Sequence, residues 1–283
     1  MNLGVNSFLR QADKLPSLPA LYYELIRIIE DRDSSVEDIC KVLRMDQGLV
    51  TRLLKLANSA FYGFSSKVAT INQAVQFIGS REIHHLVLAT SMIKAFSKIP
   101  SRLVDVTAFW EHSIACGIVT ALLAERCHKP VPEQFFVAGL LHDVGRLILF
   151  LYAPGDSVEI LKTCEAEEEL MFRVEPKVLG FNHAALGAEL ISLWRLPSAV
   201  REMVGGHHNP ARSSVVQHAF LIHYADFIVH ALELGSNGER FVPPLTVPDN
   251  CQGCLLEDYE MEFMAREIEA QCQEVFPILA GAN

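Results

Sequence analysis

The sequence lacks the features of secreted and membrane-spanning proteins. Its start, MNLGVNSFLRQADK, has no basic region followed by an apolar core, so we expect no signal peptide. The longest clean apolar run near the centre, Leu147 to Ala153, is far shorter than the ~20 residues that span a bilayer. The seven cysteines are an odd number without framework spacing, which favours reduced thiols in a cytoplasmic protein.

Positive charge is also scarce. The chain has 24 Lys and Arg residues against 34 Asp and Glu residues, a formal net charge of -10 with His neutral. This balance argues against non-specific binding to nucleic acid or to an acidic membrane, because both need a basic surface. The length of 283 residues is enough for one large helical domain or two smaller ones.

Two local motifs have weak functional interpretations. Cys251 and Cys254 form a C-x-x-C, but no second Cys/His pair lies at zinc-finger spacing, so we interpret them as loop cysteines. The stretch 36–58 has the length and central break of a helix-turn-helix, with basic residues that include Arg44 and Arg52. Its acidic residues and its leucine-rich second half favour packing over nucleic-acid binding.

Apolar residues recur with helical spacing along most of the chain, and no stretch alternates with period two. Ser35 and Asp38 form a capping-box-like pair before one predicted helix, and a continuous helix is expected over 133–152. We predict an all-α fold in three parts. These are a smaller N-terminal helical part at 1–100, a helical bundle at 101–235, and a linker with a final helix at 236–283.

The most informative polar residues lie in or beside otherwise apolar helices after residue 111. Buried imidazole and carboxylate groups are costly unless they are hydrogen-bonded, paired or bound to a cation. Groups on separate helices that converge meet this cost together if they share a metal ion. An ordered set is also far more specific than one His-Asp dipeptide. The set is His112, His142, Asp143, His183, His207, His208 and Asp226.

This set resembles the ligands of the HD superfamily of metal-dependent phosphohydrolases, whose bundle-like fold we therefore expect for residues 101–235. The surrounding text is more specific and resembles the HDOD family, the signalling-associated relatives of the HD-GYP phosphodiesterases. The resemblance covers roughly residues 12–230. It is carried by LPSLPALYYELIRII, LVTRLLKLANSAFYG, INQAVQFIGSREIHHLVLA, AGLLHDVGRLIL, NHAALGAELISLWRLP and GHHNP.

The resemblance implies an all-α protein of bacterial signal transduction with one or two divalent metal ions. His112, His142, Asp143 and Asp226 match the ligands of one ion, and His183, His207 and His208 match positions that hold a second. Many HDOD domains lack this ligand set, whereas here every position is filled. Histidine with carboxylate suits Fe, Mn, Zn or Ni. The alternative is that these residues are satisfied core groups inherited from an enzyme ancestor.

The resemblance also names residues that would act in catalysis. Asp143 would bridge the ions that supply hydroxide, and Arg146 would steady a phosphate oxygen where HD-GYP enzymes have a lysine. A surface salt bridge is the alternative for Arg146. After His208 the chain continues with Asn209, whereas an HD-GYP enzyme continues into an acidic loop bearing Gly-Tyr-Pro, so hydrolysis of cyclic di-GMP is not expected.

Two hypotheses therefore stand. The first is a regulatory HDOD protein that binds a signalling partner in trans and keeps the metal site for structure or sensing. The second is a metal-dependent phosphohydrolase acting on a nucleotide or other phosphoester. His223 and His230, which share a helix face with Asp226, are predicted to support the ligands or to lie at an interface. His84 and His85 are predicted to be structural.

Overall fold

The structure is a computed structural model that describes residues 3–11, 19–59, 61–96, 103–129 and 132–280. These residues form fifteen α-helices and two 3-10 helices and no strand, which confirms the predicted all-α class. The chain divides into two compact units. The larger combines Met1–Leu15 with Lys98–Ile268, and the smaller combines Pro16–Ser97 with Glu269–Asn283. The division thus assigns residues 1–15 to the larger unit, and it falls within the last long helix.

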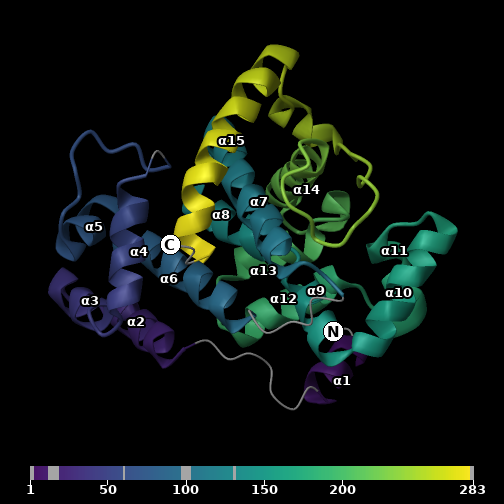
Figure 1. Ribbon diagram of the computed structural model, residues 1–283, viewed down its shortest axis with the longest axis horizontal. Coiled ribbons are helices and arrows are strands. Elements are labelled where there is room, and N and C mark those ends of the chain that lie inside the picture. The colour runs from purple at the N-terminus through teal and green to yellow at the C-terminus, as the bar shows by residue number, and fades with distance from the viewer. Residues whose placement is uncertain (1–2, 12–18, 60, 97–102, 130–131, 281–283) are drawn as a thin grey trace. The chain divides into compact units, whose positions relative to one another are not determined.

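The larger unit is built around α7, which is buried on almost every side. Helix α7 packs against α8 and α14, while α12 packs against α9 and α13 (Figure 1). An apolar helix of this kind lies inside a bundle because it offers no polar face to water. The elements are α1 (Leu3–Gln11), α7 (Val106–Arg126), α8 (Pro132–Leu141), α9 (Val144–Tyr152), α10 (Pro154–Glu167), α11 (Met171–Leu179), α12 (His183–Leu193), α13 (Ser198–Gly206), η1 (Pro210–Arg212), α14 (Val216–Ala231) and η2 (Asp249–Cys254). Helix α15 (Asp258–Ala280) contributes its first half.

The smaller unit contains five short helices besides the end of α15. The Ser35 hydroxyl accepts a hydrogen bond from the backbone N–H of Asp38, and the Asp38 carboxylate accepts one from the backbone N–H of Ser35, which confirms the predicted capping box. Arg44 donates to Glu37 and Asn72, so its charge is paired within this unit rather than free for a phosphate. The helices are α2 (Ala20–Glu30), α3 (Val36–Leu43), α4 (Gln47–Ala57), α5 (Ile71–Ile78) and α6 (Ser80–Ala95).

The helix predicted over 133–152 is in fact two helices. Helix α8 ends at Leu141 and α9 begins at Val144, so His142 and Asp143 form the turn between them. The prediction of one helix was wrong because residues on both sides of the turn are apolar and buried, which leaves no break in the pattern. The break matters for the site, since it frees the two side chains from the fixed ~100° separation of helical neighbours.

Two helical stretches of the described chain are apolar and long enough to cross a membrane on those two criteria alone. They are Val106–Arg126 and Gln134–Tyr152, and 72% and 89% of their apolar windows are buried inside the protein. Both are much longer than the clean apolar run from Leu147 to Ala153. Burial within the larger unit accounts for their apolar character, because core helices of folded domains pass the same two criteria.

His84 makes the smaller unit sensitive to acid. Its ring stacks on Tyr22 at 4.8 Å between centroids, and burial lowers the pKa of His84 to about 4. Because the unfolded chain then binds the proton more readily between pH 6.5 and 4, this histidine stabilises the fold at neutral pH and loses that contribution as the pH falls. The expected loss between pH 7.5 and 5 is about 2 kcal/mol.

The variant His84→Phe keeps the stacking and cannot be protonated. We expect its free energy of unfolding to fall by about 2 kcal/mol less than that of the wild type between pH 7.5 and 5, as measured by urea denaturation. Parallel pH dependence in the two proteins would show that His84 is already exposed to solvent in the fold.

Candidate metal centre

Five segments of the larger unit bring the seven predicted ligands together. His112 lies on α7, His142 and Asp143 on the α8–α9 turn, and His183 opens α12. His207 and His208 directly follow α13, and Asp226 lies on α14. Six of these side chains are buried, and His208 is partly buried. The residues predicted from the cost of their burial and from the family resemblance thus form one compact polar cluster inside an apolar bundle.

The first group of possible ligands gathers where α7 and α14 meet the turn. His112 Nε2 lies 3.1 Å from Asp226 Oδ1, and His142 Nε2 lies 3.7 Å from the same oxygen. Cys116, one turn along α7, has its Sγ 3.5 Å from His112 Nε2. One ligand atom from each of these four residues lies within 4.8 Å of all the others, which is close enough for one ion.

The second group gathers at the start of α12 and the end of α13. His183 Nε2 lies 3.0 Å from Asp143 Oδ1 and 2.7 Å from His208 Nε2. His207 Nε2 lies 3.7 Å from Asp143 Oδ1. Asp143, His183, His207 and His208 again each offer a ligand atom within 4.8 Å of the others.

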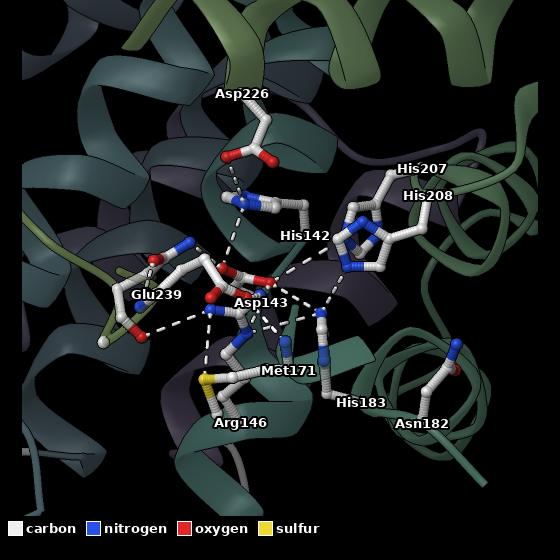
Figure 2. Close-up of polar contacts among 12 residues, drawn as sticks. His142, Asp143, Arg146, Met171, Asn182, His183, His207, His208, Asp226 and Glu239 are labelled. Carbon is white, nitrogen blue, oxygen red and sulfur yellow. Dashed lines mark hydrogen bonds and ion pairs between the residues drawn. The ribbon is translucent and has the colours of Figure 1, made fainter. Parts of the chain in front are cut away.

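Asp143 lies between the two groups. Figure 2 shows its carboxylate near the middle, with His142 and Asp226 on one side and His183, His207 and His208 on the other. Its Oδ2 is 3.2 Å from His142 Nε2, while its Oδ1 faces the second group. The two oxygens can therefore bind separate ions, as a bridging carboxylate does in two-metal sites.

Three histidines direct the same ring nitrogen into the cluster. The Nδ1 of His142 is 2.7 Å from the carbonyl of Gly139, and that of His207 is 2.7 Å from the carbonyl of Val204. The Nδ1 of His183 is 2.7 Å from Glu175 Oε2. An Nδ1–H that donates to an oxygen leaves the Nε2 lone pair for a metal ion, and this arrangement is usual for metal-binding histidines.

Burial and the two aspartates have opposite effects on the pKa values of the histidines. Burial lowers the pKa of His112 to about 4 and that of His207 to about 3, so both rings are neutral at pH 7. Burial also opposes a charge on His142, yet Asp143 and Asp226 raise the pKa of His142 to about 10. The space between the two carboxylates therefore favours positive charge.

Several atoms at the centre have no hydrogen bond. Among the described residues, His142 Nε2, His207 Nε2 and Asp143 Oδ1 are buried and accept or donate none, although other charged groups lie nearby. Buried polar atoms without partners are rare because each one costs free energy. Cations at the two groups would satisfy these atoms, the first with His142 Nε2 and the second with His207 Nε2 and Asp143 Oδ1, so the residues present fit a metal site.

Arg146 is not a surface residue, so the alternative of an exposed salt bridge is wrong. Its side chain is 1% exposed, and its Nε lies 3.3 Å from Asp143 Oδ1. One terminal nitrogen is 3.4 Å from the carbonyl oxygen of Asn237. The other is 3.9 Å from Glu239 Oε2 (Figure 2). The guanidinium thus faces protein groups, and its contact with a phosphate stays a prediction.

Four further residues of the cluster were missed by the sequence analysis. Cys116 could have been found, since it follows His112 at i+4 on the same helix face. Glu175 lies in an ordinary amphipathic helix, and Asn237 and Glu239 lie in the stretch interpreted as a linker. All four are buried.

His223 and His230 support the cluster rather than extend it. His230 Nδ1 lies 3.0 Å from Asp226 Oδ1, and His223 Nδ1 lies 2.9 Å from the carbonyl of His207. His223 Nε2 accepts a hydrogen bond from the backbone of Thr246 at 3.0 Å. Each ring therefore holds a residue of the cluster in position.

Glu175 offers a test of this support. It is fully buried and accepts the backbone N–H of His183 at 2.8 Å in addition to its contact with the ring. Glu175→Gln keeps an oxygen for the backbone but removes the charge that faces Nδ1. We expect divalent-metal affinity, measured by calorimetric titration with Co²⁺, to fall about 10- to 100-fold. The exposed Glu159→Gln is the control, and equal losses in both variants would contradict a specific role.

Most of the chain resembles one known protein family. The sequence profile of the HDOD domain matches residues 15–210. The chain belongs to the HDOD family. The match includes α7 and the turn with His142 and Asp143, together with the second group of ligands, and it ends before Asp226.

Two curated proteins are similar to part of this chain. An uncharacterized protein of Treponema pallidum is 29% identical over 199 residues, which are 70% of this chain and 38% of that protein. The uncharacterized protein YuxH of Bacillus subtilis is 23% identical over 127 residues, 45% of this chain and 30% of that protein. The matched regions are thus less than half of these relatives' length.

Solved structures share the fold over nearly the whole chain. An HDOD domain protein of unknown function from Geobacter sulfurreducens superposes with a TM-score of 0.76 at 22% identity, covering 98% of this chain and 96% of the other. A candidate phosphohydrolase from Shewanella amazonensis SB2B superposes with a TM-score of 0.77 at 25% identity, covering 96% and 98%. These likenesses confirm the HD-like helical architecture.

Proposed function

We propose that this HDOD protein is a regulatory protein of bacterial signal transduction that binds one or two divalent metal ions and acts through a protein partner in trans. The observation that best supports metal binding is the central position of Asp143, which has one oxygen towards each group of ligands. The cluster has histidine, carboxylate and one thiol, a donor set that suits Zn or Fe and also accepts Mn or Ni.

Burial favours regulation over turnover. Six of the seven predicted ligands are buried, and Asn237 and Glu239 are buried beside Asp143 and Arg146. A hydrolase needs an open coordination position and space for the phosphoester at the metal. A buried metal centre suits an ion that stabilises the fold or acts as a signal. Binding of that ion would change the conformation of the protein, and a partner would recognise the change.

A phosphohydrolase is the second candidate, favoured by the complete ligand set and by the likeness to the Shewanella protein. The bound ions would polarise the phosphoester and lower the pKa of a water molecule. Asp143 would hold the ions together, and Arg146 would reach a phosphate oxygen once its contacts with Asn237 and Glu239 are released. We infer that either activity takes place in the cytoplasm.

Hydrolysis assays on the metal-loaded protein separate the two candidates. The wild type, Asp143→Ala and the exposed control Asp156→Asn are loaded with Mn²⁺, Fe²⁺ or Zn²⁺ and offered a phosphodiester and nucleotides. We expect the wild type to bind metal without turnover. Turnover that is lost in Asp143→Ala and kept in Asp156→Asn would instead establish the phosphohydrolase.

A further inference from the structure

A short segment after α14 enters the metal cluster. We call Gly235–Arg240 the plug segment; it opens the long loop that follows α14 in Figure 1. The backbone N–H of Ser236 donates to the carbonyl of Ala108 on α7 at 2.9 Å. Gly235 has a φ of +68°, and a Cβ at this position would overlap the backbone of α7 at Ala108 and His112. Only glycine therefore allows the segment to lie so close to the ligand helix.

The amide of Asn237 is held in one orientation. Its Oδ1 accepts the backbone N–H of Glu239 at 3.0 Å, so its NH2 group faces the cluster. Nδ2 donates to Asp143 Oδ2 at 2.6 Å and lies 3.2 Å from His112 Nε2. The side chain is fully buried.

The NH2 group thus lies against two atoms that would bind the first ion. A metal ion is held about 2.0–2.2 Å from histidine nitrogen and carboxylate oxygen. An ion bound to both His112 Nε2 and Asp143 Oδ2 would need the same lone pairs and much of the same space as Nδ2. The amide and the ion cannot both occupy this position.

We propose that Asn237 is an intramolecular competitor for the metal centre, and that metal binding displaces the plug segment. This inference rests on the proposed metal site and adds to it a means of regulation. In the structure described above, the NH2 group of Asn237 takes the place of a cation at Asp143. Metal entry breaks that hydrogen bond and moves the backbone that carries it.

Displacement would change more than one contact. Glu239 Oε2 accepts the backbone N–H of Met171 at 2.8 Å and lies near Arg146, while Arg240 pairs with Glu165 at 2.6 Å. Gly238, Glu239 and Arg240 also line a cavity of about 310 Å³ beside α10. Movement of the plug segment therefore releases Arg146 and alters the surface next to α10. A partner that binds this surface would distinguish the metal-bound protein from the metal-free protein.

The first test is the Co²⁺ affinity of the full chain, measured by calorimetry for the wild type, Asn237→Ala and Asn250→Ala. Asn250 is an exposed asparagine of η2, beyond the end of this loop, and serves as the control. Removing a competing hydrogen bond to a charged group should tighten Co²⁺ binding about 10- to 100-fold in Asn237→Ala and leave Asn250→Ala unchanged. Equal or weaker binding in Asn237→Ala would overturn the competition.

The second test needs no variant. Hydrogen exchange of the wild type is measured with and without Co²⁺, and the amide hydrogens of residues 235–240 are expected to exchange faster in the metal-bound protein. Unchanged or slower exchange there would overturn the displacement. If neither the wild type nor Asn237→Ala binds Co²⁺, the metal site itself is refuted. If the wild type binds Co²⁺ and either test fails, only the plug is refuted.

Discussion

Replacing Asp143 with asparagine is expected to weaken divalent-metal binding by at least about 100-fold, more than the loss of a group that merely supports a ligand. Asp143 has one oxygen towards each group of ligands, so its loss is expected to affect two ions where the loss of one histidine affects one. Asparagine keeps the shape of the side chain but removes the negative charge that opposes Arg146 and His142. Co²⁺ titration of the purified protein measures the change.

The same substitution should also destabilise the metal-free protein. Arg146 is 1% exposed, and Asp143 carries the charge nearest to its Nε. Removing one partner of a buried ion pair leaves the other charge uncompensated, at a cost of about 3–5 kcal/mol. We expect the melting temperature to fall by roughly 10 °C. The exposed Asp156→Asn should change neither property, and a normal Co²⁺ affinity in Asp143→Asn would show that the carboxylate is no ligand.

A methyl group at Gly145 should have an effect of similar size by a purely steric route. A Cβ there would overlap the carbonyl oxygen of His183 and lie 3.0 Å from the backbone nitrogen of Gly187. Both contacts are backbone, so no flexible side chain can move aside. Helices α9 and α12 would have to separate, which also draws His183 away from Asp143.

For Gly145→Ala we therefore expect a loss of about 3 kcal/mol in the free energy of unfolding, together with weaker Co²⁺ binding. Gly155→Ala is the matched control, since nothing lies within 4 Å of a Cβ at that helical position. Alanine there should be neutral or slightly stabilising. Similar stability of the two variants in thermal unfolding would mean that α9 and α12 are less closely packed than described.

The ligands on this fold could be predicted because each of them is an exception to its surroundings. His112 lies in a helix that is otherwise almost wholly apolar, and His183 follows a capping asparagine at the start of another. Such residues are costly to bury, so their presence in apolar helices already indicates a shared polar site from the sequence alone. The family's sequence patterns then indicated which exceptions belong together.

The residues that were missed lie where the pattern is ordinary. The turn at His142 and Asp143 leaves no signal because both flanking helices are buried. Asn237 is one polar residue in a polar loop, and only the backbone contact of Ser236 with Ala108 brings it to the cluster. Glu175 has the usual appearance of a helix-surface glutamate, although both of its oxygens contact His183. Each of these positions depends on tertiary packing rather than on local sequence.

The most direct test of the central claim is the number of Co²⁺ ions that the full chain binds. The protein is purified without chelator, dialysed against excess Co²⁺ and then against buffer, and its metal content is measured by mass spectrometry. We predict one or two ions per chain in the wild type and in Asp156→Asn, and almost none in Asp143→Asn. A wild type that retains no ion, or an Asp143→Asn that retains as many as the wild type, would contradict a metal centre built around Asp143.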